Sequence, residues 1–191
     1  MKRHLLFALI LTALASSTSY ASDKVSFGKV GLAGNGCPEE TELVSQALVK
    51  LDDTSLRIIP LKFVLSSKPP ARSFIRKKCD VALAVKVVKG YQVGISKASV
   101  QSFLALDDAS KSSIQLDTGF TGSEFENTES KLDSAIYQNT ELLSNTTQWS
   151  ACGRDTIIRI KVSATLQADY MQVSYLRING FGLDFEYRAC S

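Results

Sequence analysis

Apolar side chains recur at every second position in several long stretches of this chain. The alternation is clearest at residues 81–87, 158–166 and 181–187, and residues 93–106 continue the extended character. Successive side chains of a strand point to opposite faces of a sheet, so a period of two predicts β-strands with one buried face. Two short alternating runs on either side of Asp52-Asp53-Thr54 predict a hairpin over residues 47–58.

Strands with one apolar face bury it best by stacking as two antiparallel sheets over a shared core. The sequence therefore predicts an all-β fold, a two-sheet antiparallel β-sandwich. A closed β-barrel is the alternative, because a period of two does not distinguish closure from stacking.

Residues 118–148 interrupt the alternation and are rich in Ser, Thr, Asn and Glu. We expect a long polar loop there, a kind of segment that is often functional or mobile. Leu132 and Ile136 lie four residues apart, so a short helix from Glu129 to Tyr137 is an alternative for part of it.

The N-terminus has the pattern of a secretory signal peptide, with a basic head, an apolar run from Leu5 to Ala15, and small residues at Ser19 and Ala21. The apolar run is about half the roughly 20 residues that a membrane-spanning helix needs. We expect residues 1–21 to be removed and residues 22–191 to form a single domain. That domain is predicted to be secreted or periplasmic, monomeric and without a membrane span.

Cleavage at that position would also remove His4, the only histidine in the chain. Ser-His-Asp and Cys-His catalysis need an imidazole, and most catalytic zinc and iron sites need a histidine ligand. We therefore expect no site of these kinds, no metal and no cofactor. Basic residues would number 20 against 19 acidic ones once Lys2 and Arg3 are lost, so net charge gives no case for a polyanion. Nucleic acid is not expected either, since the compartment is wrong and aromatic residues are not interleaved with the basic ones.

All four cysteines, Cys37, Cys79, Cys152 and Cys190, lie in the predicted mature chain. An even number of cysteines in an oxidising compartment predicts disulfides. A zinc site is disfavoured, because no two cysteines lie within four residues of each other and no histidine remains. Three connectivities are open, and the sequential one closes two loops of roughly forty residues.

Basic residues gather between Thr54 and Cys79, a segment without a single acidic residue. This pattern is typical either of a patch that meets an anionic surface polymer, such as an acidic polysaccharide, or of a solvated face balanced by the acidic region at 107–141. The balanced face is the preferred interpretation. The candidate binding residues are Arg72, Arg76, Lys77 and Lys78.

Aromatic side chains are the other candidates for binding, because exposed rings can stack on sugars. Tyr91 and Trp149 are the named candidates, and Trp149 lies three residues from Cys152. A tryptophan so close to a disulfide normally packs over it in the core, which is the preferred interpretation. Further aromatic residues that could join such a platform are Tyr137, Tyr170 and Tyr175.

Paired carboxylates could hydrolyse glycosides without histidine. The chain offers Asp52-Asp53, Asp107-Asp108, Asp117, Asp155 and Asp184. Neighbouring residues of a strand point to opposite faces, however, and Asp-Asp pairs between strands are ordinary in turns. No calcium-loop spacing is present, and no catalytic residue is assigned.

Five short segments around the cysteines together resemble the DUF4360 family of small secreted proteins. The segments are Gly34-Asn35-Gly36-Cys37-Pro38, Arg76-Lys77-Lys78-Cys79, Gly90-Tyr91, Trp149-Ser150-Ala151-Cys152-Gly153 and Tyr187-Arg188-Ala189-Cys190. The resemblance implies a secreted β-rich domain of unknown function, found in bacteria and fungi, without assigned catalytic residues. It supports the pairing of Cys37 with Cys79 and of Cys152 with Cys190. The long acidic insertion before Trp149 departs from the family pattern.

The leading hypothesis is a non-catalytic module that binds a cell-surface polymer, a polysaccharide or a protein. It rests on the missing histidine, the missing G-x-S-x-G nucleophile motif and a disulfide-held scaffold. The alternatives are a secreted, glycosidase-like hydrolase that depends on carboxylates, and a toxin or inhibitor that acts through residues 118–148.

If the signal peptide is cleaved after Ala21, the exported protein begins at Ser22. Intact-mass measurement and N-terminal sequencing of the protein recovered outside the cytoplasm check this expectation. Replacing Ala21 by a large residue should block processing and leave the longer chain, because the peptidase requires small residues at this site. Recovery of the exported protein with Met1 still in place would contradict the prediction.

Overall fold

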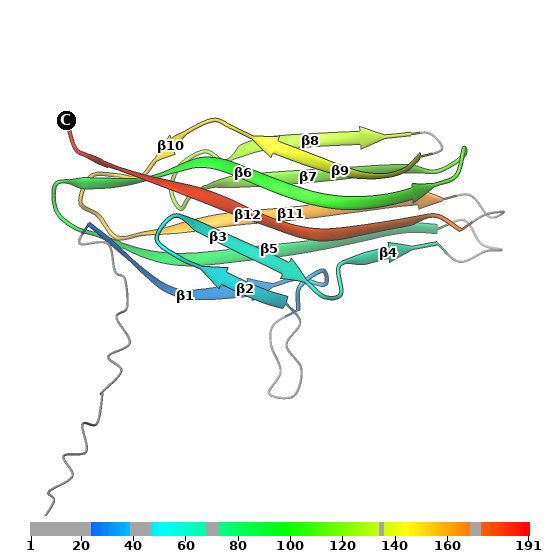
Figure 1. Ribbon diagram of the computed structural model, residues 1–191, viewed down its shortest axis with the longest axis horizontal. Helices are drawn as coiled ribbons and strands as arrows, with labels where there is room; N and C mark the ends of the chain where they lie inside the picture. Colours follow the sequence, from blue (N-terminus) through cyan, green and yellow to red (C-terminus); the bar gives the residue numbers. More distant parts are fainter. Residues whose placement is uncertain (1–23, 39–46, 68–72, 134–135, 169–172) are drawn as a thin grey trace, which may run out of the picture.

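The computed structural model describes residues 24–38, 47–67, 73–133, 136–168 and 173–191. The predicted signal peptide lies outside these ranges, as do Arg72 and Tyr170. Within the ranges, all regular elements are β-strands (Figure 1), and no helix there could cross a membrane. The strands are β1 (Val25–Ala33), β2 (Ala47–Leu51), β3 (Ser55–Pro60), β4 (Val64–Ser66), β5 (Ser73–Val87), β6 (Tyr91–Leu106), β7 (Lys111–Phe120), β8 (Glu126–Leu132), β9 (Ile136–Ser144), β10 (Gln148–Trp149), β11 (Thr156–Ala168) and β12 (Tyr175–Ala189).

The strands form two separate antiparallel sheets. The five-stranded sheet has the order β1-β5-β11-β7-β8, and the seven-stranded sheet has the order β10-β6-β12-β3-β2. In addition, β9 pairs with β6, and β4 pairs with β12. The predicted β-sandwich is confirmed, and the alternative of a closed barrel is wrong.

Four long strands, β5, β6, β11 and β12, run lengthwise through the molecule (Figure 1). At about 3.3 Å per residue, the longest of them spans about 50 Å. Their inward positions carry aliphatic and aromatic side chains that are almost fully buried, and burial of this apolar area is the main favourable contribution to folding. The inward residues include Val81, Leu83, Val85, Ile158, Ile160, Val162, Leu183 and Phe185.

The segment 118–148 is not a loop, and it contains no helix among its described residues. Strands β8 and β9 form there and pair with β7 and β6 respectively. Alternation did not reveal them because both faces of these strands are largely polar: β8 has no fully buried residue, and an inward position of β9 is Thr140, whose hydroxyl hydrogen-bonds that of Ser102 at 2.6 Å. Polar strands of this kind are stable at a sheet edge, where one side faces water.

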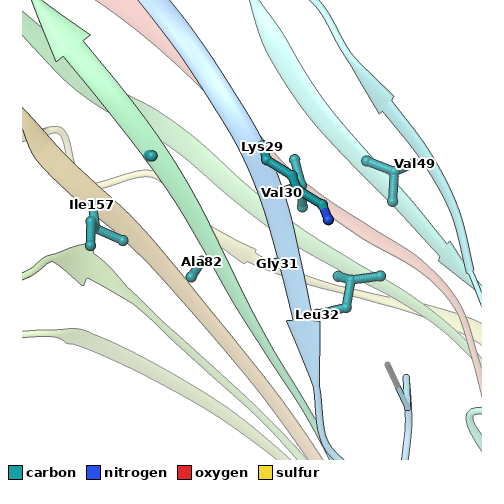
Figure 2. Close-up of a pocket in the computed structure, with 8 residues that line it drawn as sticks. Lys29, Val30, Gly31, Leu32, Val49, Ala82 and Ile157 are labelled. Atoms are coloured by element: carbon teal, nitrogen blue, oxygen red, sulfur yellow. The ribbon is translucent and has the colours of Figure 1, made fainter. Parts of the chain in front are cut away.

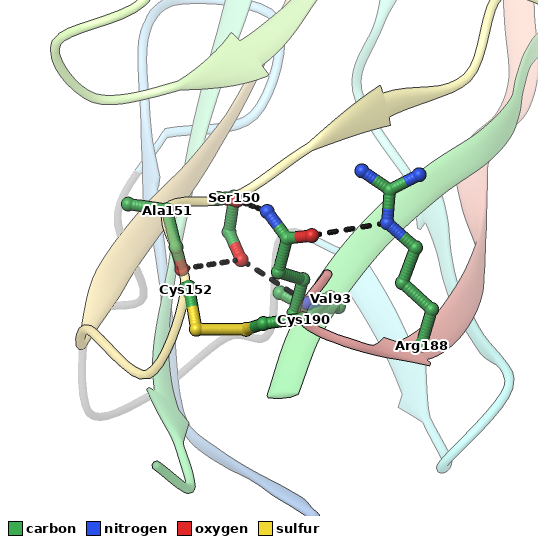
Figure 3. The surroundings of a disulfide bond; sticks show 7 residues. Val93, Ser150, Ala151, Cys152, Arg188 and Cys190 are labelled. Atoms are coloured by element: carbon green, nitrogen blue, oxygen red, sulfur yellow. Dashed lines mark hydrogen bonds between the residues drawn. A yellow bond between two sulfur atoms is a disulfide. The ribbon is translucent and has the colours of Figure 1, made fainter. Parts of the chain in front are cut away.

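Two disulfides are formed, in the sequential pairing. Cys37–Cys79 joins the segment after β1 to β5, and both residues are 0% exposed. Cys152–Cys190 joins the β10–β11 connection to the C-terminal residues (Figure 3), and Cys152 is exposed. One bridge therefore lies inside the core, and the other fastens one end of the sandwich at its surface.

Mild reduction is expected to open Cys152–Cys190 before Cys37–Cys79. Thiol–disulfide exchange requires a thiolate to reach a sulfur atom, and only the Cys152–Cys190 bridge is accessible. Titration with dithiothreitol, alkylation of the freed thiols and peptide mapping measure the order. Cys152 and Cys190 should carry the first labels. Labelling of Cys37 and Cys79 first, or of all four cysteines together, would contradict the expectation.

Candidate functional site

Three aromatic side chains from three strands meet on the outer face of the seven-stranded sheet. Phe103 of β6 contacts Tyr137 of β9 edge-on, with ring centroids 5.1 Å apart. Its centroid lies 6.2 Å from that of Tyr175 of β12. Tyr137 is 83% exposed. We call Phe103, Tyr137 and Tyr175 the aromatic platform.

Strand register brings these residues together. Ala105 of β6 pairs with Tyr137 on one side and Tyr175 on the other. The two tyrosines are therefore separated by two strand spacings, about 10 Å. The small side chain of Ala105 lies between them, and Phe103 is the next outward residue of β6.

Two β-bulges set the direction in which the platform points. In β6 the inward positions are odd-numbered at Val93 and Ile95 but even-numbered from Ala98 onward, because the pairing with β12 shifts by one residue between them. A second shift, in β12 between Ile178 and Gly180, has the same effect there. Residues on the two sides of a bulge point to opposite faces of the sheet when the alternation is continued through it. Phe103, after the bulge of β6, and Tyr175, before the bulge of β12, therefore lie on the outer face, where both are half-buried.

The sequence singled out Tyr137 and Tyr175 but missed Phe103. The sequence signal for Phe103 is a large aromatic residue between Ser102 and Leu104. That signal is usable only if the bulge in β6 is known, because unbroken alternation from Val93 and Ile95 would place Phe103 inside the core.

Trp149 lies at the opposite end of the same sheet and is not a core residue. It pairs with Gly94, and its ring is packed so closely on that glycine that a Cβ there would come within 2.9 Å of ring carbons. The guanidinium carbon of Arg188 lies 4.0 Å from the ring centroid, and Arg188 Nε donates to Gln92 Oε1 at 3.0 Å. The preferred interpretation, packing in the core over the disulfide, is wrong because β10 presents Trp149 on the outer face.

Tyr91 is also covered by a cation and lies apart from the platform. The Lys24 ammonium nitrogen is 5.3 Å from its ring centroid, and the ring packs partly against the core. Tyr91 pairs with Ala189, and Trp149 is three residues before Cys152, so both belong to the end of the sandwich that carries Cys152–Cys190 (Figure 3). Their role in binding stays a prediction.

The side chains of the basic residues 76–78 point to both faces of the five-stranded sheet. Arg76 and Lys78 are exposed on the outer face of the five-stranded sheet, and Asn35 holds their backbone through Lys78 N–H at 2.8 Å and Arg76 O at 3.2 Å. Lys77 points the other way and donates to the carbonyl of Lys62 at 2.8 Å. Burial, and to a smaller degree the charge of Lys62, lowers the pKa of Lys77.

The outer face that holds Arg76 and Lys78 carries both signs of charge. Lys161 of β11 pairs with Asp80 of β5 on one side and with Asp117 of β7 on the other. Mixed charge favours the interpretation of this face as a balanced, solvated surface.

Asp52 and Asp53 lie in the turn between β2 and β3. Asp52 accepts from the backbone N–H groups of Thr54 and Ser55 at 2.9 and 2.8 Å, and hydrogen bonds from Thr54 and then Ser55 lower the pKa of Asp52. The Tyr187 hydroxyl donates to the carbonyl of Asp53, and burial, followed by the charges of Asp53 and Asp52, raises the pKa of Tyr187 to about 12.

Among the remaining candidates, the carboxylates of Asp107, Asp117, Asp155 and Asp184 also have partners within the protein. Asp107 accepts from the N–H of Ala109 at 3.0 Å, and Asp184 forms an ion pair with Arg57. In the part of the chain that the structure describes, no three potential metal ligands come together.

An open groove of about 620 Å³ lies beside β1. Figure 2 shows Val30 and Leu32 on the side of β1 that faces Val49 of β2, with Ala82 and Ile157 on its other side. The other described lining residues are Lys29, Gly31 and Ala84. The lining is therefore apolar with one cation.

Glu126, at the start of β8, joins the two sheets through hydrogen bonds. Ser144 Oγ of β9 donates to its Oε1 at 2.5 Å, and Gln148 Nε2 of β10 donates to its Oε2 at 3.3 Å. Burial alone would raise the pKa of Glu126, but hydrogen bonds from Ser144, Thr146 and Gln148 outweigh it and lower the pKa.

Comparison with known proteins identifies the family. A sequence model of the family described as a domain of unknown function, DUF4360, matches residues 23–188, and the chain belongs to that family. The search of curated proteins finds no match. Among solved structures, TmCBM61 in complex with β-1,4-galactotriose is 13% identical over 87% of this chain and 88% of that chain, with a TM-score of 0.26. At that TM-score neither a fold nor a ligand is carried over.

Replacing Glu126 by Gln should lower the free energy of unfolding by about 1 kcal/mol at pH 7, through loss of charge-assisted hydrogen bonds. A carboxyl whose pKa is lower in the folded state stabilises above its unfolded pKa, and this contribution is lost as the pH falls through the folded pKa. The difference in free energy of unfolding between wild type and Glu126→Gln should therefore shrink as the pH falls below the usual pKa of glutamate.

Urea denaturation at pH 7 and at successively lower pH measures that gap. The control is Glu124→Gln, a change of the same kind at an exposed neighbouring position. A gap that stays the same at every pH would show that the charge of Glu126 is not responsible.

Proposed function

We propose that this member of the DUF4360 family is an exported, non-catalytic module that binds polysaccharide through the aromatic platform. The observation that carries the proposal is the convergence of Phe103, Tyr137 and Tyr175 on a solvent-facing sheet surface, with Tyr137 83% exposed. Contiguous apolar patches on a protein surface often mark binding sites.

The chemistry of the platform suits sugars. A pyranose ring has an apolar face of C–H groups that packs on an aromatic ring, and hydroxyl groups at its edge that need hydrogen-bond partners. Tyr137 and Tyr175 supply both a ring and a phenolic hydroxyl. Asn139, which is exposed and pairs with Phe103 across β6 and β9, adds an amide that can donate and accept.

The platform is also held in place before a ligand arrives. Its three residues stand on strands whose backbones are hydrogen-bonded to one another through β6. Binding residues on such strands lose less conformational entropy than residues on loops, so more of the contact energy appears as affinity.

Export is supported by the two disulfides, because such bridges form and persist in oxidising compartments. We place the protein in the periplasm or outside the cell after removal of residues 1–21. Polysaccharide ligands are abundant in both places.

The two alternative functions have less support. A glycosidase needs two carboxylates facing each other across the substrate, whereas the described lining of the groove beside β1 is apolar with Lys29. A toxin or inhibitor acting through a free loop at 118–148 conflicts with the strands β8 and β9 in that segment.

Replacing Tyr137 or Tyr175 by Ala should weaken polysaccharide binding by about three- to tenfold each, the equivalent of one aromatic contact. Affinity electrophoresis and calorimetry against a panel of purified cell-wall and plant polysaccharides measure this. Phe74→Ala is the matched control, since Phe74 is 70% exposed but stands on β5 of the other sheet.

The panel is assayed for new reducing ends in parallel. Retention without cleavage, reduced in the two tyrosine variants and unchanged in Phe74→Ala, supports the proposal. If the polysaccharides retain all variants as strongly as the wild type, the binding surface lies elsewhere on the protein. Release of reducing ends would show that the protein is a hydrolase instead.

A further inference from the structure

We propose that the polysaccharide bound by the platform is a polyuronate, and that Arg177 binds its carboxylate groups. This inference rests on the proposed function, because it assigns a ligand class to the same surface. It is carried by the position and the unpaired state of Arg177.

Arg177 stands beside the central ring of the platform. It pairs with Phe103 across β6 and β12, two residues from Tyr175, and it is exposed. Paired residues on one face of a sheet have Cβ atoms about 5 Å apart. The guanidinium can therefore reach the edge of a sugar ring that stacks on Phe103 or Tyr175.

No described residue forms a hydrogen bond or an ion pair with the guanidinium of Arg177. Two other arginines on the outer face of this sheet are engaged: Arg57 pairs with Asp184 and donates to the carbonyl of Leu183 at 2.6 Å. Arg188 donates to Gln92 and covers the ring of Trp149. Arg177 is thus the arginine of this group whose donors are open to a ligand.

The chemistry of arginine selects the ligand class. A guanidinium presents N–H groups in a planar fork that matches a carboxylate in a bidentate way. A polyuronate repeats a carboxylate on every ring while keeping the apolar ring face that stacks on aromatic side chains. One sugar unit can then occupy Phe103 and Arg177 together.

The charges around the platform also predict how the bound sugar is oriented. Glu141 of β9 pairs with Gln101, one outward position along from Phe103, so the β9 side carries a negative charge. Arg177 lies on the β12 side. Because a carboxylate is repelled by Glu141 and attracted by Arg177, the acidic edge of the sugar should face β12.

The experiment compares polygalacturonate with its methyl ester, which keeps the backbone and removes the charge. The full exported protein should bind the acid form about tenfold more tightly than the ester, as expected for a charge-assisted hydrogen bond. Arg177→Ala should remove that preference while still binding the ester, and Arg177→Lys should keep only part of it, because a lysine lacks the fork. The control is Arg154→Ala, an exposed arginine that follows β10.

The outcomes separate the two proposals. Equal affinity of wild type for acid and ester, with Tyr137→Ala still weakening both, overturns the polyuronate inference and keeps the platform. No binding of either polymer, with neutral polysaccharides also unbound, overturns both. Equally tight binding of dextran sulfate, weakened to the same extent by Arg154→Ala and Arg177→Ala, shows general charge attraction and overturns the role of Arg177.

Discussion

The apolar contact between the inner faces of the two sheets is the interaction on which the rest of the structure depends. Alternate residues of β5, β6, β11 and β12 are almost completely buried in it. Because these inward side chains supply the apolar contact between the sheets, the outward positions of the same strands are available for other contacts. The outer face of the seven-stranded sheet therefore carries its aromatic platform on strands that are paired with one another and packed on the core.

The two ends of the seven-stranded sheet differ in how their aromatic rings are used. At the end fastened by Cys152–Cys190, Lys24 and Arg188 lie over the rings of Tyr91 and Trp149. At the other end the platform rings contact one another, and the nearby cation, Arg177, has no partner among the described residues. A cation–π contact gives both the ring and the cation a partner, so the rings of Tyr91 and Trp149 are already covered. The guanidinium of Arg177, near the platform, has no such partner among the described residues, which is why we propose the ligand site there.

Alternation predicted the β-sandwich, the hairpin at 47–58 and the long strands, because each of these has one apolar face. It failed at β8 and β9, whose two faces are both largely polar and whose strand character comes from pairing with β7 and β6. Pairing depends on residues distant in the sequence, which a local pattern does not contain. The disulfides were predictable from cysteine number and compartment, whereas the exposure of one bridge and the burial of the other depend on the completed fold.

The platform could not be predicted for a further reason, which lies in the two bulges. If odd-numbered residues were inward throughout β6, as Val93 is, and throughout β12, as Phe181 is, then Phe103, Tyr175 and Arg177 would all be buried. One inserted residue in each strand reverses the facing, and all three side chains come to the surface in register. A bulge interrupts the sheet pairing without adding to the core, and bulges often re-aim side chains next to functional sites. Two bulges on neighbouring strands that bring the same group of residues to the outer face support the proposal that this surface binds a ligand.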